Sequence, residues 1–216
     1  MTHSIFSCFF AVARAGGLLL ATLLFSLSAH ADYVWLERDG ATAHAYLGEL
    51  QPDRPAASVE LLGDARAFMA DSKSLATTMR DSHYTVANLR EGGDLRFTAK
   101  RQSSNGGLLF YQAKAGREDT KPVNDLELVP DQAGGNTFRL YWKSKQVPAD
   151  QVNVYTSEGW TRSFKAAADG SVTITTPFPG RYVLEVTAKV NGTVELEGKK
   201  YDDVRHVATV SFVVAK

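Results

Sequence analysis

The chain has 216 residues, equal numbers of basic and acidic side chains (24 of each) and one cysteine, Cys8. The balanced charge argues against a nucleic-acid or anionic-membrane binder, since such proteins concentrate positive charge. The single cysteine excludes an internal disulfide and a cysteine-based metal cluster.

Residues 1–31 are typical of a secretory signal peptide. Arg14 supplies the early positive charge, an apolar run covers residues 15–25, and Ala29-His30-Ala31 is a small-x-small cleavage site. The run is shorter than the roughly 20 residues that cross a bilayer. We therefore predict cleavage after Ala31, a periplasmic location and no membrane span in the mature protein. Cleavage after Ala29 is the alternative, and it would expose His30 as part of an N-terminal metal chelate.

The segment from residue 32 to residue 125 contains short apolar or alternating runs that favour β-strands. Asn105-Gly106 predicts a turn between two of them. Residues 64–79 contain Ala, Leu and Met and leave a helix open as the alternative to strands. Residues 116–125 are polar and contain a proline, which indicates a loop, and we place a domain boundary near Asp125. The expected strands cover residues 33–36, 43–47, 95–99 and 107–111.

Residues 126–216 alternate more clearly. Asp169-Gly170 predicts a hairpin, Pro177–Gly180 predicts a turn, and Asn191-Gly192 predicts another tight turn. The last strand, residues 206–214, is apolar on both faces and should lie centrally in its sheet. The predicted fold class is all-β, with two β-sandwich (immunoglobulin-like or prealbumin-like) domains, 32–125 and 126–216, after a signal peptide over 1–31.

The second half resembles the prealbumin-like or carboxypeptidase-regulatory-like β-sandwich. That family has a connector into a V-x-V strand, a D-G hairpin and a closing P-G-x-Y-x-L-x-V strand. This chain matches at Val147–Val154, Ala168–Ile174 and Pro179–Val186. It departs at Ser144-Lys145, where a glycine is usual, and the departure weakens the prediction of a turn there. The resemblance implies a β-sandwich for this half.

Nearly the whole mature chain is similar to periplasmic proteins of the DUF4198 type, which are grouped with nickel- and cobalt-uptake components. The resemblance implies an exported, non-catalytic protein with a link to metal acquisition, and it supplies no set of ligand residues. The segments that carry it are D-Y-V-W-L-E at 32–37, Y-L-G-E at 46–49, F-Y-Q-A-K-A-G-R at 110–117, L-E-L-V-P at 126–130, G-N-T-F at 135–138, T-P at 176–177, P-G-R-Y at 179–182 and Y-D-D-V-R-H at 201–206.

A metal site in the mature chain would need imidazole and carboxylate ligands, because the only thiol leaves with the signal peptide. The candidate metal ligands are His44, Glu49, His83, Asp202 and His206. None has the spacing of a ligand motif such as H-E-x-x-H, so an ordinary surface or packed role is the simpler interpretation of each histidine. The residues alone fix no cofactor, and a nickel or cobalt ion is the candidate.

The remaining polar residues suggest no active site, and we expect no enzymatic activity. Asp202 and Asp203 are adjacent, so on a strand they would face opposite ways, and a polar turn is the simpler interpretation. Lys114 and Arg117 would suit an anion or a carboxylate, although a solvated strand end is simpler. Trp160 would suit a sugar ring, with packing over the end of the sandwich as the favoured alternative.

The leading hypothesis is an exported ligand- or partner-binding protein, as an accessory component of nickel or cobalt uptake. Its partners would be a metal ion or metal complex and an envelope transporter or receptor, with no nucleic acid. The alternatives are a structural or adaptor module of the cell envelope and a carbohydrate-binding accessory domain.

Overall fold

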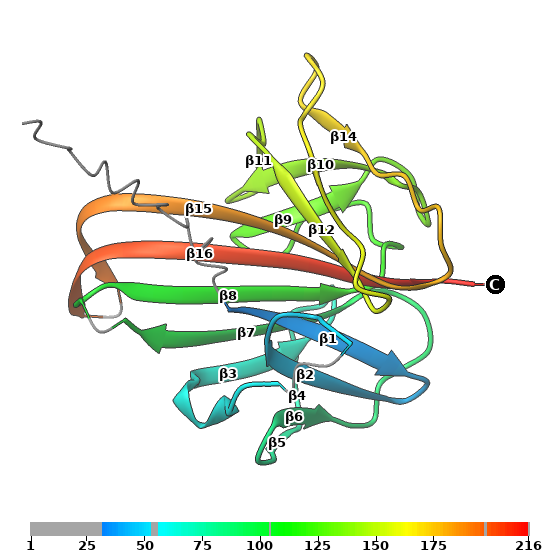
Figure 1. Ribbon diagram of the computed structural model, residues 1–216. Coiled ribbons are helices and arrows are strands. Elements are labelled where there is room, and N and C mark those ends of the chain that lie inside the picture. The colour runs from blue at the N-terminus through cyan, green and yellow to red at the C-terminus, as the bar shows by residue number, and fades with distance from the viewer. Residues whose placement is uncertain (1–31, 53–55, 104, 197, 216) are drawn as a thin grey trace, which may run out of the picture.

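The computed structural model describes residues 32–52, 56–103, 105–196 and 198–215, and these form an all-β protein (Figure 1). The predicted all-β fold class is confirmed. The predicted signal peptide, its predicted cleavage after Ala31 and the alternative cleavage before His30 fall outside the described residues. Within the described part of the chain, no helix is long and apolar enough to cross a membrane.

Sixteen strands and one short 3₁₀ helix (Val59–Leu61) make up the described structure. The strands are β1 (Tyr33–Asp39), β2 (Thr42–Gly48), β3 (Gly63–Phe68), β4 (Ser74–Leu75), β5 (Thr77–Met79), β6 (His83–Val86), β7 (Leu95–Gln102), β8 (Leu108–Ala115), β9 (Leu126–Pro130), β10 (Thr137–Trp142), β11 (Lys145–Val147), β12 (Val152–Thr156), β13 (Thr161–Phe164), β14 (Ser171–Thr173), β15 (Gly180–Leu196) and β16 (Lys199–Val214).

The strands form three sheets. The largest has eight strands in the order β13-β12-β15-β16-β8-β7-β3-β4, and a second has the order β1-β2-β6-β5. In the third, β10 pairs with β9 along one edge and with β11 and β14 along the other. The two small sheets lie on opposite sides of the large sheet (Figure 1).

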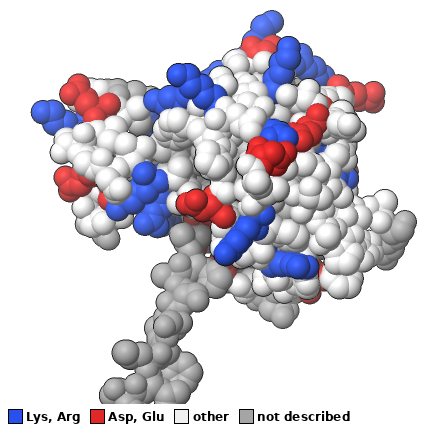
Figure 2. Space-filling view, turned by 90° about the horizontal axis from the view of Figure 1, so that it is seen from above, with Lys and Arg blue, Asp and Glu red and all other residues white. Residues whose placement is uncertain are grey.

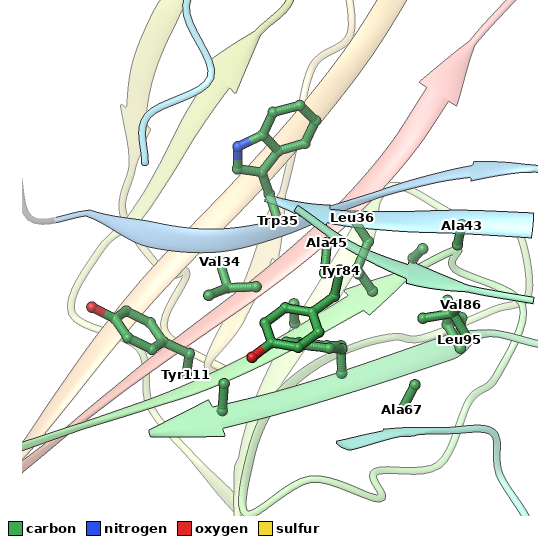
Figure 3. Packing of buried hydrophobic residues seen from close by; sticks show 14 of the residues in the cluster. Val34, Trp35, Leu36, Ala43, Ala45, Ala67, Tyr84, Val86, Leu95 and Tyr111 are labelled. Carbon is green, nitrogen blue, oxygen red and sulfur yellow. The ribbon is translucent and has the colours of Figure 1, made fainter. Parts of the chain in front are cut away.

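The alternation of side chains along β16 creates two hydrophobic cores. Val207 belongs to the core beneath the β1-β2-β6-β5 sheet, which also contains Leu36 and Phe97 (Figure 3 shows part of this core). Ala208 and Val210, on the opposite face, belong to the core beneath the β9-β10-β11-β14 sheet. Because β16 is covered on both faces and paired on both edges, by β15 and β8, its predicted central position is confirmed.

The two halves of the chain share the large sheet. The predicted boundary near Asp125 falls in the connection between β8 and β9. However, β16 from the second half pairs with β8 from the first in parallel, from Val204 opposite Leu108 to Ser211 opposite Ala115. Backbone hydrogen bonds therefore join the two halves along a full strand edge.

Residues 64–79 lie largely in β3, β4 and β5, so the strands expected there are present and the alternative helix is not. Two other local predictions were wrong. Asp169-Gly170 turns the chain, but it connects β13 of the large sheet with β14 of a small sheet, so it closes no hairpin. Asp202 and Asp203 lie inside β16 and not in a turn.

The predicted turn at Asn191-Gly192 is a bulge. Strand β15 continues through these residues, and its register with β16 shifts between Asn191 and Val194. Gly192 has a φ of +90°, a conformation that glycine adopts without a Cβ clash. The extra residue is therefore absorbed within the ladder, and pairing continues as far as Leu196 opposite Lys199.

Charges of both signs are mixed on the surface. Viewed from above, basic and acidic side chains alternate across the visible face without forming a broad region of one sign (Figure 2). This distribution agrees with the equal numbers of the two kinds in the sequence.

Candidate functional site

Two of the candidate metal ligands, His44 on β2 and His83 on β6, lie side by side. In the antiparallel pairing of these strands, Tyr46 lies opposite His83 and His44 lies opposite Thr85. The two imidazole centroids are 4.8 Å apart, with the rings nearly perpendicular. The sheet thus unites two histidines that form no motif in the sequence.

Both rings have nitrogen atoms that could bind a metal ion. His44 Nδ1 is buried and has no hydrogen-bond partner among the described residues. His83 Nδ1 lies 3.3 Å from Ser82 Oγ. Burial lowers the pKa of His83 below its usual 6.5, and the neighbouring His44 and Arg80 lower it further. A neutral imidazole has the free lone pair that a metal ion requires.

An aromatic wall borders the histidine pair. The Tyr46 ring lies 5.5 Å from His83, and Trp35 on β1 stacks on Tyr46 with 4.7 Å between centroids. Figure 3 shows Trp35 on the other side of β1 from the core residue Val34. Burial raises the pKa of Tyr46, and the nearby Glu37 raises it further, so the phenol stays neutral. Within this wall, Tyr46 is the residue whose ring lies beside both imidazoles.

A charged pair supports this wall from the large sheet. Arg181 Nε on β15 lies 3.2 Å from Glu37 Oε1 on β1. The Glu37 carboxylate also lies near enough to Tyr46 to raise the pKa of its phenol. Glu37 and Arg181 thus place a charged pair beside the aromatic wall.

The other three candidate ligands lie elsewhere. Glu49 is buried beyond the end of β2 and accepts a hydrogen bond from Gln51 Nε2 at 2.6 Å. Asp202 is exposed on β16, beside the turn at Gly106. Among the residues that the structure describes, no three His, Cys, Asp or Glu side chains converge as a metal-binding group.

His206 is a packed core histidine. It is 7% exposed, its Nδ1 lies 3.0 Å from Gln112 Nε2, and the Trp142 ring meets it edge-on at 4.6 Å. Burial lowers the pKa of His206 to about 4. The ring is therefore neutral at pH 7, and its surroundings are aromatic.

A buried charge cluster, defined by Asp94, Arg96, Lys114, Asp119 and Glu127, lies where β7, β8 and β9 meet. Arg96 binds Glu127 through Nη2 at 2.8 Å and Nε at 3.2 Å, and it binds Asp119 through Nη1 at 2.8 Å. Lys114 Nζ lies 3.2 Å from Glu127 and 3.7 Å from Asp94. No sequence motif marks this cluster. The predicted solvated strand end at Lys114 is wrong, because this side chain is fully buried.

Burial and pairing act in opposite directions within the cluster. Burial alone would raise the pKa of Glu127, but Lys114, Arg96 and the backbone N–H of Asn124 outweigh it and hold that pKa below its ordinary value. For Asp94, burial prevails and raises the pKa, although Lys114 and two backbone N–H groups oppose it. Glu127 is therefore the stable anion around which both cations are arranged.

The sequence matches none of the protein-family models, and it matches none of the curated protein sequences with which it was compared.

Proposed function

We propose that this chain is an exported periplasmic protein that binds a divalent transition-metal ion between His44 and His83, as an accessory component of nickel or cobalt uptake. The observation that carries the proposal is the 4.8 Å separation of the two imidazoles, together with the unpartnered Nδ1 of His44. Imidazole is a ligand that nickel, copper and zinc all accept.

A site with only two protein ligands is better suited to exchanging a metal ion than to storing one. Structural metal sites usually have four protein ligands, which close the coordination sphere. A pair of imidazoles leaves the remaining positions to water or to a small chelator. Such a site takes up and releases an ion readily, as an accessory of uptake must.

The cellular context of the proposal rests on the sequence. The features of residues 1–31 favour export, and the DUF4198-type segments favour a link to metal acquisition. The partner would be an envelope transporter or receptor that receives the ion. Catalysis is not part of the proposed role.

Calorimetric titration of the purified, chelator-treated protein with nickel, cobalt, copper and zinc chlorides tests the metal site. We expect saturable binding of at least one of these ions. His44→Ala and His83→Ala should each weaken it about tenfold or more, since each removes one of two ligands. The matched control is Asp202→Asn, a candidate ligand on another sheet, which should bind like the wild type. No heat with any ion, or equal losses in all three variants, would refute the site.

An apolar cleft supports partner or carbohydrate binding as the second candidate. Its volume is about 750 Å³ and its lining includes Trp160, Phe178 and Val213. Phe178 is 43% exposed and Val213 is 58% exposed, whereas Trp160 is partly buried against Phe178. Solvent-facing apolar side chains of this kind often mark contact surfaces.

A glycan array and cross-linking in envelope extracts test the second candidate. Trp160→Ala should abolish a glycan signal or a specific cross-link, because it removes the largest side chain in the cleft. The absence of both signals in the wild type would eliminate this candidate.

A further inference from the structure

A second cleft opens where the β1-β2-β6-β5 sheet meets one end of the large sheet, beside the loop between β9 and β10. It has a volume of about 620 Å³ and is bordered by the end of the β1-β2 hairpin, the loop before β7, the start of the loop after β8, and β16. All five glycines that line it have positive φ: Gly40, Gly92, Gly93, Gly116 and Gly134. Because glycine lacks a side chain, the backbone itself forms much of this surface and a ligand can approach it closely.

Arg117 lines this cleft, and only one nitrogen of its guanidinium group, Nη1, donates hydrogen bonds among the described residues. Nη1 donates to Asn136 Oδ1 and, at 3.4 Å, to the carbonyl of Gly135. The guanidinium lies over the Phe212 ring, 4.3 Å from its centroid. Among the described residues, Nε and Nη2 donate no hydrogen bond, and no carboxylate forms an ion pair with this side chain. Burial lowers the pKa of Arg117, with only Glu118 acting against it.

Arg38 lines the same cleft and is likewise held by neutral groups. Its Nη1 donates to the carbonyl of Gly93 at 2.7 Å and its Nη2 to the carbonyl of Arg90 at 2.6 Å. Within the described part of the chain it has no ion-pair partner. Backbone carbonyls thus orient this guanidinium without neutralising it.

The acidic groups of the cleft do not neutralise these two cations. Asp94 is fully buried and is occupied by Lys114 and by the backbone N–H groups of Glu118 and Asp119. Glu91 and Glu118 are exposed at the rim. A third arginine, Arg181, is already paired with Glu37. In the described structure, Arg38 and Arg117 are therefore partly buried and in no ion pair, whereas Glu91 and Glu118 are exposed.

We infer that this cleft binds a small organic molecule through a carboxylate group, which lies between Arg117 and Arg38. The planar guanidinium of Arg117 can donate two parallel hydrogen bonds from Nε and Nη2 to the two carboxylate oxygens. The glycine backbone leaves room for the rest of a compact molecule. A dicarboxylic acid and an amino acid share this chemistry, and the acidic rim would favour the ammonium group of an amino acid. The inference does not depend on the proposed metal site.

Calorimetric titration of the chelator-treated protein with succinate, L-glutamate and sulfate tests the inference. We expect saturable binding of succinate or glutamate and none of sulfate. The one that binds more tightly shows whether the ligand is a dicarboxylic acid or an amino acid. Arg117→Gln should weaken binding about tenfold or more, because it removes a charged hydrogen-bond donor. Arg117→Lys, which keeps the charge but loses the planar fork, should have an intermediate effect.

Two controls make the result specific. Arg162→Gln removes an exposed arginine on β13, outside the cleft, and should leave binding unchanged. The His44→Ala/His83→Ala double variant should also bind as the wild type does, which separates this cleft from the metal site. Near-UV circular dichroism establishes that each variant is folded. The inference is overturned if neither carboxylate binds, or if Arg117→Gln and Arg162→Gln bind equally well.

Discussion

Ser211 on β16 is linked to Leu36 on β1, the first strand of the described residues: its hydroxyl donates to the carbonyl of Leu36 at 2.7 Å, across 175 residues of sequence. Thr209 makes the equivalent bond to the carbonyl of Val34 at 2.6 Å. Both contacts are buried, and they satisfy carbonyl groups on β1, which pairs with only one neighbouring strand, β2. Side-chain hydroxyls therefore replace a second ladder at this edge.

Thr209→Val should reduce the free energy of unfolding by about 1–3 kcal/mol. The substitution keeps the shape of the side chain but leaves the Val34 carbonyl buried without its donor. Urea denaturation provides the measurement. Thr161→Val, at an exposed position of β13, is the matched control and should change stability by less than about 0.5 kcal/mol. Equal effects of the two substitutions would contradict this account.

Arg96→Met should be among the most destabilising substitutions in the protein, with a loss of about 3–5 kcal/mol. It would leave Glu127 with only Lys114 as a cationic partner and would remove the cation bound to Asp119. Thermal and urea unfolding measure the loss. Arg162→Met, which removes an exposed arginine, should have little effect. A fully stable Arg96→Met protein would show that the cluster contributes no net stability.

Gly116→Ala should destabilise the protein more than Gly92→Ala. Both glycines have positive φ, so an alanine at either position strains the backbone by about 1 kcal/mol or more. At Gly116 the new Cβ would also collide with Asp94 of the charge cluster, whereas nothing lies within 4 Å at Gly92. The difference between the two midpoints of denaturation reports the collision together with the greater backbone strain at Gly116, whose φ of +109° is further from the left-handed region than the +73° of Gly92. Identical midpoints would argue against this close approach.

His206 should make the protein less stable in mild acid. Its pKa is about 4 in the folded state and 6.5 in the unfolded state, so the unfolded chain binds more protons between these pH values. The contribution of the neutral ring to the free energy of unfolding is fully present above pH 6.5 and is lost as the pH falls towards 4. The loss amounts to about 3 kcal/mol.

Comparison with His206→Gln isolates this contribution. Other titrating groups are present in both proteins, so their effects cancel in the difference between the two unfolding free energies. We expect the wild type to lose stability relative to the variant as the pH is lowered from 7 to 4. Parallel pH profiles would contradict the assignment.

Strand positions could be predicted from the sequence wherever one face of a strand is apolar. The pattern at residues 138–142 and the doubly apolar run at 206–214 both correspond to observed strands. The connections were harder to predict, because Asn191-Gly192 has the composition of a tight turn and also of a bulge. Only the register of β15 with its partner strand β16 distinguishes a turn from a bulge.

The sites were less predictable than the strands. Arg96 alternates with Leu95 and Phe97, which by itself indicates a solvent-facing position. The structure covers that face with β9 and the preceding loop, whose Glu127 and Asp119 bind the guanidinium. Likewise, the approach of His44 to His83 depends on the pairing of β2 with β6, and no local pattern encodes it. The sequence feature that could have indicated these sites is the presence of polar residues in otherwise apolar strands.

The parallel ladder between β8 and β16 has a consequence for biogenesis. Until β16 has been synthesised, the edge of β8 lacks this partner, and its apolar Leu108–Tyr111 segment is open to pairing with other chains. The large sheet can close only once β16 is present, since its contacts join distant parts of the chain. A chain that lacks β16 would therefore be prone to aggregate.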